Sequence, residues 1–194
     1  MYKIFFVSLI LLFNFLPIAA ADDEAKVFVD NIASQVLSVL NAQATTAGER
    51  REKLIEIFTE AIEINWMAKF ALGRNWQTLS LAQQNEYVAV YKNYLIDTYV
   101  NRFMEYKSQK LLISAAQQVS QGNYVVKTEI VQNHENKPNV RVDYRLSSKY
   151  SSRYGHFKII DIVIEDVSMI TSQRSEFTQV INTKGFYGLL EKLK

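Results

Sequence analysis

Halfway along the chain, the spacing of apolar residues changes from the period of a helix to that of a strand. Residues 81–106 contain neither Gly nor Pro, and their apolar and aromatic residues recur at helical spacing. Residues 140–147 read Val-Arg-Val-Asp-Tyr-Arg-Leu-Ser, the alternation of a strand with one solvent-exposed face. Because the helical patterns precede the strand patterns, the chain is expected to form an α+β fold.

The remaining elements follow from the same two periods. Helical spacing predicts a helix over residues 24–43, a second that carries Leu54 to Ile62, and a short third that ends at Gly73. Ser80 and Gln83 fit a capping box at the start of the helix over 81–106. Four strands are expected, over residues 111–119, 124–132, 140–147 and 157–165. The short turns between them, at 121–123 and 136–138, predict an antiparallel meander. Two closing helices, 172–182 and 186–194, are split at Gly185.

The first 21 residues have the three parts of an export signal. A short start with Lys3 precedes an uncharged apolar run over residues 4–15, and Ala19 and Ala21 supply small residues for cleavage before Asp22. The apolar run is shorter than the ~20 residues of a membrane span, so a membrane-spanning protein is not expected. The sequence thus predicts a cleaved signal peptide over 1–21 and one mature domain over 22–194. Within that domain, 22–107 is helical, 108–167 forms the sheet, and 168–194 forms C-terminal helices.

Composition argues against several classes of function. Without Lys3, the mature chain has 21 basic and 20 acidic residues, a net charge of +1. This net charge does not indicate binding to nucleic acid or to an anionic membrane surface. The chain has no Cys, which leaves neither a lipid attachment site nor a disulfide. Its two His, His134 and His156, are far apart, so no metal site and no His-based catalytic triad are expected. No cofactor motif is present.

Two acidic residues leave an enzymatic function open. Asp161 and Glu165 lie on the last predicted strand at the same parity, and paired carboxylates can act as acid and base. The alternative is structural: Asp161 caps a helix or pairs with Arg141 or Arg145, and Glu165 lies at the rim of the sheet. Asp161 lies in an otherwise apolar strand, so it is expected to have a partner under either interpretation.

The long helix over 81–106 carries several tyrosines on one face, with Arg102 in the same stripe. Core packing explains such a stripe. However, each buried phenol needs a hydrogen-bond partner, so tyrosine is less favourable than leucine in a core without water. The stripe also suits a cavity whose contents are apolar at depth and polar at the mouth. The face consists of Tyr87, Tyr91, Tyr94, Leu95, Thr98, Tyr99 and Tyr106.

Several stretches resemble one known family along nearly the whole mature chain. The stretch Ala-Leu-Gly-Arg-Asn-Trp over 71–76, followed by Ser-Leu-Ala-Gln-Gln over 80–84, is similar to a conserved block of the MlaC family. Residues 138–146 resemble a strand of that family, and residues 157–170 resemble a fairly specific motif of it. There are two departures in the last motif. Phe157 stands where the family commonly has Trp, and Asp166 stands where it has Gly; Asp tolerates a left-handed backbone at modest cost.

The resemblance implies a phospholipid carrier of the periplasm that works with a lipid-asymmetry ABC transport system. It implies a four-stranded curved antiparallel sheet packed against several helices, with a deep apolar pocket for acyl chains. The implied partners are an outer-membrane lipoprotein complex and the lipid-binding subunit of an inner-membrane ABC transporter, with the carrier a monomer. The alternatives are an enzyme on a cone-shaped α+β fold with Asp161 or Glu165 as base, and a pocketless envelope adaptor.

The residues expected to line the lipid pocket come from the helices, the strands and the start of the closing segment. They are Trp66, Phe70, Tyr87, Tyr91, Tyr94, Leu95, Tyr99, Val126, Ile130, Val142, Tyr144, Val163, Val167 and Met169.

Overall fold

The computed structural model describes residues 18–105, 110–132 and 138–194. Most of the predicted signal peptide lies outside these residues, as do Tyr106 and part of the turn expected at 136–138. Residues 18–21, on the N-terminal side of the expected cleavage site, form the start of the first helix.

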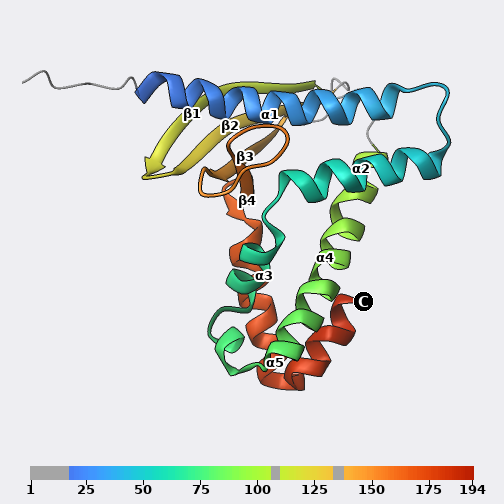
Figure 1. The fold of residues 1–194 in the computed structure, drawn as a ribbon, viewed down its shortest axis with the longest axis vertical. Helices are drawn as coiled ribbons and strands as arrows, with labels where there is room; N and C mark the ends of the chain where they lie inside the picture. The colour runs from blue at the N-terminus through green and yellow to red at the C-terminus, as the bar shows by residue number, and fades with distance from the viewer. Residues whose placement is uncertain (1–17, 106–109, 133–137) are drawn as a thin grey trace, which may run out of the picture.

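The first half of the described chain is helical, as predicted (Figure 1). Helix α1 spans Ile18–Asn41, α2 spans Ala47–Ala61, α3 spans Ile64–Leu72 and α4 spans Leu81–Met104. A 3-10 helix, η1 (Gly73–Thr78), joins α3 to α4.

Side-chain caps fix where two of these helices begin. The predicted capping box at α4 is confirmed: Ser80 accepts a hydrogen bond from the Gln83 backbone, and the Gln83 side chain accepts one in return. Thr46 and Glu49 form a second capping box at the start of α2, which the sequence analysis did not identify. The Glu49 carboxylate accepts hydrogen bonds from Thr46, and these lower its pKa.

The second half forms an open antiparallel sheet in the order β1-β2-β3-β4-β5. Its strands are β1 (Lys110–Ser120), β2 (Asn123–Val131), β3 (Val140–Ser147), β4 (Lys158–Ile164) and β5 (Val167–Ser168). The predicted α+β class and antiparallel meander are confirmed. The strand count differs because the chain turns after β4 and adds the two-residue β5.

The C-terminal segment is a single helical run with one break. Helix α5 spans Met169–Leu193, and Gly185 within it has a φ of 72° and a ψ of −179°. The predicted split at Gly185 is therefore present, because glycine adopts this conformation without a steric penalty. The helical segment begins three residues earlier than predicted, directly after β5.

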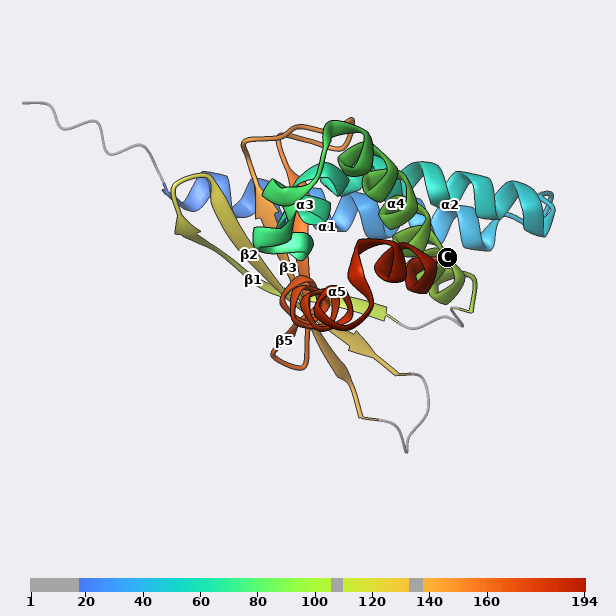
Figure 2. The same cartoon turned by 90° about the horizontal axis from the view of Figure 1, so that it is seen from below.

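The helices cover the sheet and extend away from it. Helix α1 lies along β1 and β2, while α3 and α5 pack against β4. Figure 1 shows α3, α4 and α5 below the sheet, and in the view from below the C-terminal part of α5 lies beside α4 (Figure 2). An aromatic group joins α1 to the sheet: the ring of Phe157 is 5.7 Å from that of Phe28 and 5.2 Å from that of Tyr124. None of the described helices is long and apolar enough to cross a membrane.

Candidate functional site

Strand pairing decides which sheet side chains share a face. In the antiparallel register, Val126 lies opposite Tyr144, Thr128 opposite Val142, and Ile130 opposite Val140. Directly opposed residues point to the same side, so these six share one face with Tyr124 and Leu146. We call this the inner face, because Tyr124 on it contacts Phe157, which contacts α1.

The inner face is covered unevenly. At one end, Tyr124, Val126 and Leu146 are buried with the residues of α1. Toward the other end, most apolar side chains keep part of their surface exposed, although Thr128 and Val142 among them are buried. These partly exposed residues, which we call the open face, are Leu111, Ile113, Ile130, Val140, Tyr144, Ile162 and Ile164.

Two polar groups lie within this apolar surface. Thr128 is buried, and its hydroxyl donates a hydrogen bond to the carbonyl oxygen of Val142. Tyr144 is partly exposed, and burial raises the pKa of its hydroxyl to about 12, so it stays neutral at physiological pH. Among the described residues, this surface thus presents apolar side chains and one neutral phenol, without a charged group.

The tyrosine face of α4 packs mainly against other helices. Helix α4 contacts α2, α3 and α5. The Tyr91 hydroxyl donates a hydrogen bond of 2.6 Å to the side-chain oxygen of Gln173, and its ring meets Phe177 edge-on. Tyr99 stacks on Phe58 of α2 at 5.9 Å. The structure therefore gives the inner part of the stripe helical partners.

The C-terminal end of α4 leads directly into β1, which carries part of the open face. Tyr99, Phe103 and Met104 are partly buried apolar residues of this end. Only five residues separate Met104 from Lys110, where β1 begins, so the two ends lie within about 20 Å of each other. Burial raises the pKa of the Tyr99 hydroxyl to about 12.

The other residues expected in the pocket divide into three groups. Tyr87, Tyr91 and Leu95 are completely buried, and Tyr94 is partly buried beside Phe177. Val163 pairs with Asp143 and Ser168, which places it on the opposite face from Val142 and Tyr144. Val167 is 51% exposed, and Met169 is the partly buried first residue of α5.

Trp66 and Phe70 form a surface group of their own. Their ring centroids are 5.2 Å apart, and the rings stack. Both side chains are partly exposed and lie on α3 beside its buried residues. The guanidinium of Arg174 lies over the Phe70 ring at 5.1 Å.

The two carboxylates that left an enzymatic function open have separate tasks. Asp161 is 2% exposed; its oxygens accept hydrogen bonds from the Ser168 hydroxyl at 2.7 Å and the Ile170 backbone at 3.1 Å. Arg145 lies 3.6 Å away. The structural interpretation is therefore confirmed for Asp161, which caps α5 and pairs with Arg145.

Glu165 is exposed at the rim of the sheet, also as the structural interpretation expected. It accepts a hydrogen bond from the Arg141 backbone at 2.6 Å and pairs with the Arg141 side chain at 3.3 Å. Arg141 also pairs with Asp166 at 2.7 Å, and these two carboxylates raise the Arg141 pKa.

Two cavities of the described chain lie outside the predicted site. One groove of about 440 Å³ runs between α2, α4 and the C-terminus, where Arg51 and Asp97 form an ion pair of 2.9 Å. A shallower one of about 400 Å³ lies at the turn of residues 118–121. Within the described ranges, no three His, Asp or Glu residues gather in a way that could hold a metal ion.

Two buried tyrosines of α4 allow a matched test of how the stripe is packed. In the described part of the chain, the Tyr87 hydroxyl has no hydrogen-bond partner, whereas that of Tyr91 has Gln173. Tyr87→Phe is expected to keep or raise the free energy of unfolding, by up to about 2 kcal/mol. Tyr91→Phe is expected to lower it by about 1–2 kcal/mol, because it leaves the Gln173 oxygen unpaired. Urea denaturation measures both, and a larger loss for Tyr87→Phe would contradict this packing.

Comparison with known proteins decides the family. The family model described as MlaC protein matches residues 30–194. The chain belongs to the MlaC family. The resemblance inferred from the motifs over 71–84, 138–146 and 157–170 is thereby confirmed. This MlaC protein is also similar in fold to a solved structure, the phospholipid-binding protein from Ralstonia solanacearum in complex with a phospholipid. The two are 21% identical, with a TM-score of 0.67, over 89% of this chain and 94% of the other.

The departure from the family pattern at Asp166 has a clear structural setting. Asp166 has a φ of 64° and the preceding Glu165 a φ of 46°, so both adopt the left-handed conformation between β4 and β5. A family glycine suits this turn, and Asp is among the residues that tolerate it. In this MlaC protein, the ion pair of Asp166 with Arg141 also ties the turn to β3.

Proposed function

We propose that this MlaC protein binds a phospholipid and carries it through the periplasm. In this proposal it travels between an outer-membrane lipoprotein complex and the lipid-binding subunit of an inner-membrane ABC transporter. The observation that carries the proposal is an uncharged, partly exposed apolar sheet surface in a member of the MlaC family. The solved structure of similar fold, which is described as a phospholipid-binding protein in complex with a phospholipid, supports the same ligand class.

In this proposal the acyl chains lie along the open face, beneath the C-terminal half of α4. Ile130, Val142 and Tyr144 would line the sheet side, and Tyr99 would line the helix side. Apolar side chains gain about 25 cal/mol for each Å² of surface that a ligand removes from water. The Tyr144 phenol, which like an ordinary tyrosine is neutral at physiological pH, can donate a hydrogen bond to an ester or phosphate oxygen. Tyr87, Tyr91 and Val126, being completely buried, would support these walls.

Carrying a lipid requires no catalytic residue. Burial of an acyl chain gains about 0.8 kcal/mol for each methylene, so a lipid with two long chains would leave very slowly without help. Release would then require a membrane partner that opens or receives the pocket. Both oxygens of Asp161 accept hydrogen bonds within the fold, which leaves this residue poorly placed to act as a base.

The proposed location depends on the first 21 residues. Their basic start, apolar run and small residues before Asp22 support export and cleavage of the chain. The direct test of the carrier function is native mass spectrometry of the protein purified without detergent, which is expected to detect a bound phospholipid.

A further inference from the structure

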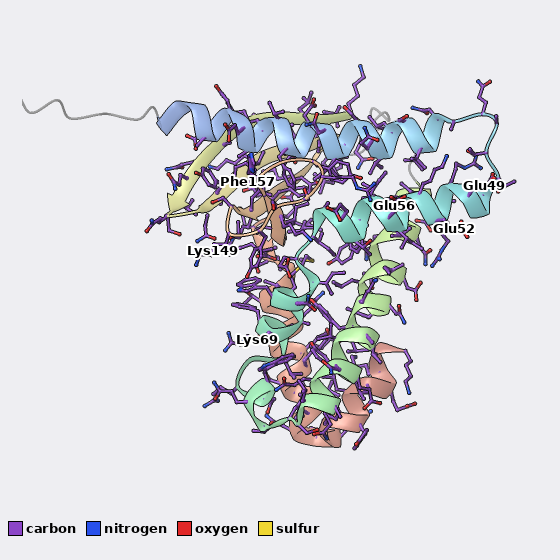
Figure 3. The ribbon with its side chains drawn as sticks, in the orientation of Figure 1. Glu49, Glu52, Glu56, Lys69, Lys149 and Phe157 are labelled. Carbon is purple, nitrogen blue, oxygen red and sulfur yellow. The ribbon has the colours of Figure 1, made fainter. Side chains whose placement is uncertain are left out.

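A basic and aromatic group lies on α3, η1 and the start of α5. Lys69, Arg74 and Arg174 are exposed, and Trp66 and Phe70 beside them are partly exposed. We call these five residues the α3 patch. Lys69 projects from the side of α3 that faces away from α4 (Figure 3).

Direct contacts join three residues of the α3 patch, Trp66, Phe70 and Arg174. The Trp66 and Phe70 rings stack at 5.2 Å, and the Arg174 guanidinium covers the Phe70 ring at 5.1 Å. The Arg174 side chain passes directly over residue 73, which is a glycine. A Cβ atom at this position would come within 2.9 Å of the Arg174 Nε atom. Gly73 also has a φ of 60°, which turns the chain from α3 toward Arg74. Residues from two distant parts of the sequence therefore form one surface.

The charge of the α3 patch is unbalanced. Residues 64–85 and 167–175 contain no Asp or Glu. Across the described ranges, Arg51, Arg141 and Arg153 each lie within 4 Å of a carboxylate, whereas the three cations of the α3 patch do not. A net charge near zero for the mature chain thus conceals a local excess of positive charge. Both tryptophans of the protein, Trp66 and Trp76, lie in this part of the chain.

We propose that the α3 patch docks the protein reversibly on the surface of an anionic phospholipid bilayer. Tryptophan and basic side chains together suit the interface between lipid headgroups and acyl chains. A basic residue near an anionic membrane strengthens binding about fivefold, so three give a contact that forms and breaks readily. An acidic protein surface would also complement the charges, but the stacked, partly exposed aromatic rings favour a lipid surface. The docking goes beyond the carrier function and does not depend on bound cargo.

The test compares two double variants of the full protein that remove the same charge. Lys69→Gln with Arg74→Gln neutralises the α3 patch, and Lys127→Gln with Lys149→Gln neutralises two exposed lysines elsewhere; Lys149 lies on the loop after β3 (Figure 3). Co-sedimentation at low ionic strength uses vesicles of phosphatidylcholine with or without phosphatidylglycerol. The patch variant is expected to bind the anionic vesicles about 25-fold more weakly than the wild type, and the control variant equally well. Tryptophan emission of the wild type is expected to shift to the blue on binding.

Three outcomes of the vesicle experiment would overturn the docking proposal. They are no binding of the wild type to anionic vesicles, equal binding to pure phosphatidylcholine, and equal losses in the two double variants. Bound phospholipid is measured separately in each protein by mass spectrometry. If the patch variant lost its cargo together with vesicle binding, these side chains would belong to the lipid site and docking would be contradicted. If the patch variant lost vesicle binding but held as much phospholipid as the wild type, docking would be supported, even if the wild type held none.

Discussion

Val142→Trp is expected to give a folded protein that has lost most of its bound phospholipid. Val142 is 5% exposed, in the middle of the inner face, and its neighbours on that face include Thr128 and Ile164. An indole there would occupy space proposed for an acyl chain. Excluding three or four methylenes, at about 0.8 kcal/mol each, weakens lipid binding by about 100-fold. Overpacking should lower the free energy of unfolding by only about 1–3 kcal/mol.

The matched control is the same substitution at the next residue. Asp143 points to the opposite face of β3. In the strand register it lies across from Lys127 of β2 and Val163 of β4. Asp143→Trp should therefore leave the amount of lipid per protein unchanged. Lipid content after detergent-free purification, together with a thermal melt, measures both variants. Normal lipid content in a well-folded Val142→Trp protein would place the lipid elsewhere.

Asp161→Ala is expected to destabilise the protein strongly without removing a catalytic group. Asp161 is buried, and it accepts hydrogen bonds from Ser168 and from the backbone of Ile170 at the start of α5. Loss of the cap and of a hydrogen bond to a carboxylate should cost about 2–4 kcal/mol of unfolding free energy. In a domain of this size, that corresponds to about 5–15 °C in melting temperature. Asp161→Asn keeps an acceptor for the Ile170 backbone and should cost less.

Glu165→Ala is the control for that experiment. Its carboxylate is exposed, and its ion pair with Arg141 is on the surface, so the expected loss is below about 1 kcal/mol. Folded protein of both variants should retain its lipid. An Asp161→Asn protein that kept its melting temperature and its lipid but lost a measurable turnover would favour the enzymatic alternative.

The sequence predicted those parts of the fold that depend on local patterns. The capping box at Ser80 and Gln83, the alternation over 140–147 and the break at Gly185 each involve residues close together in the chain. Strand β5 is absent from the prediction, because two residues are too few to show a period. The capping box of Thr46 and Glu49 is also absent from it, although Thr-Ala-Gly-Glu has the required spacing.

The candidate site could be predicted only in part, because it depends on register and on long-range contacts. Strand β4 is apolar at both parities, so the sequence did not indicate whether Ile162 or Val163 shares a face with Tyr144; the pairing shows that Ile162 does. Likewise, nothing near Tyr91 in the sequence indicates that its hydroxyl meets Gln173, a residue of α5. The α3 patch combines Lys69 and Arg174, which only the tertiary structure brings together.

Native mass spectrometry shows directly whether this MlaC protein holds a phospholipid. The protein is isolated from the periplasm without detergent and sprayed under conditions that preserve noncovalent complexes. The account predicts a protein of the mass expected for residues 22–194 with one or more phospholipids bound, which dissociate on activation and can be identified by fragmentation. Wild-type protein that is folded and free of lipid, under conditions in which a known lipid carrier keeps its cargo, would contradict the account.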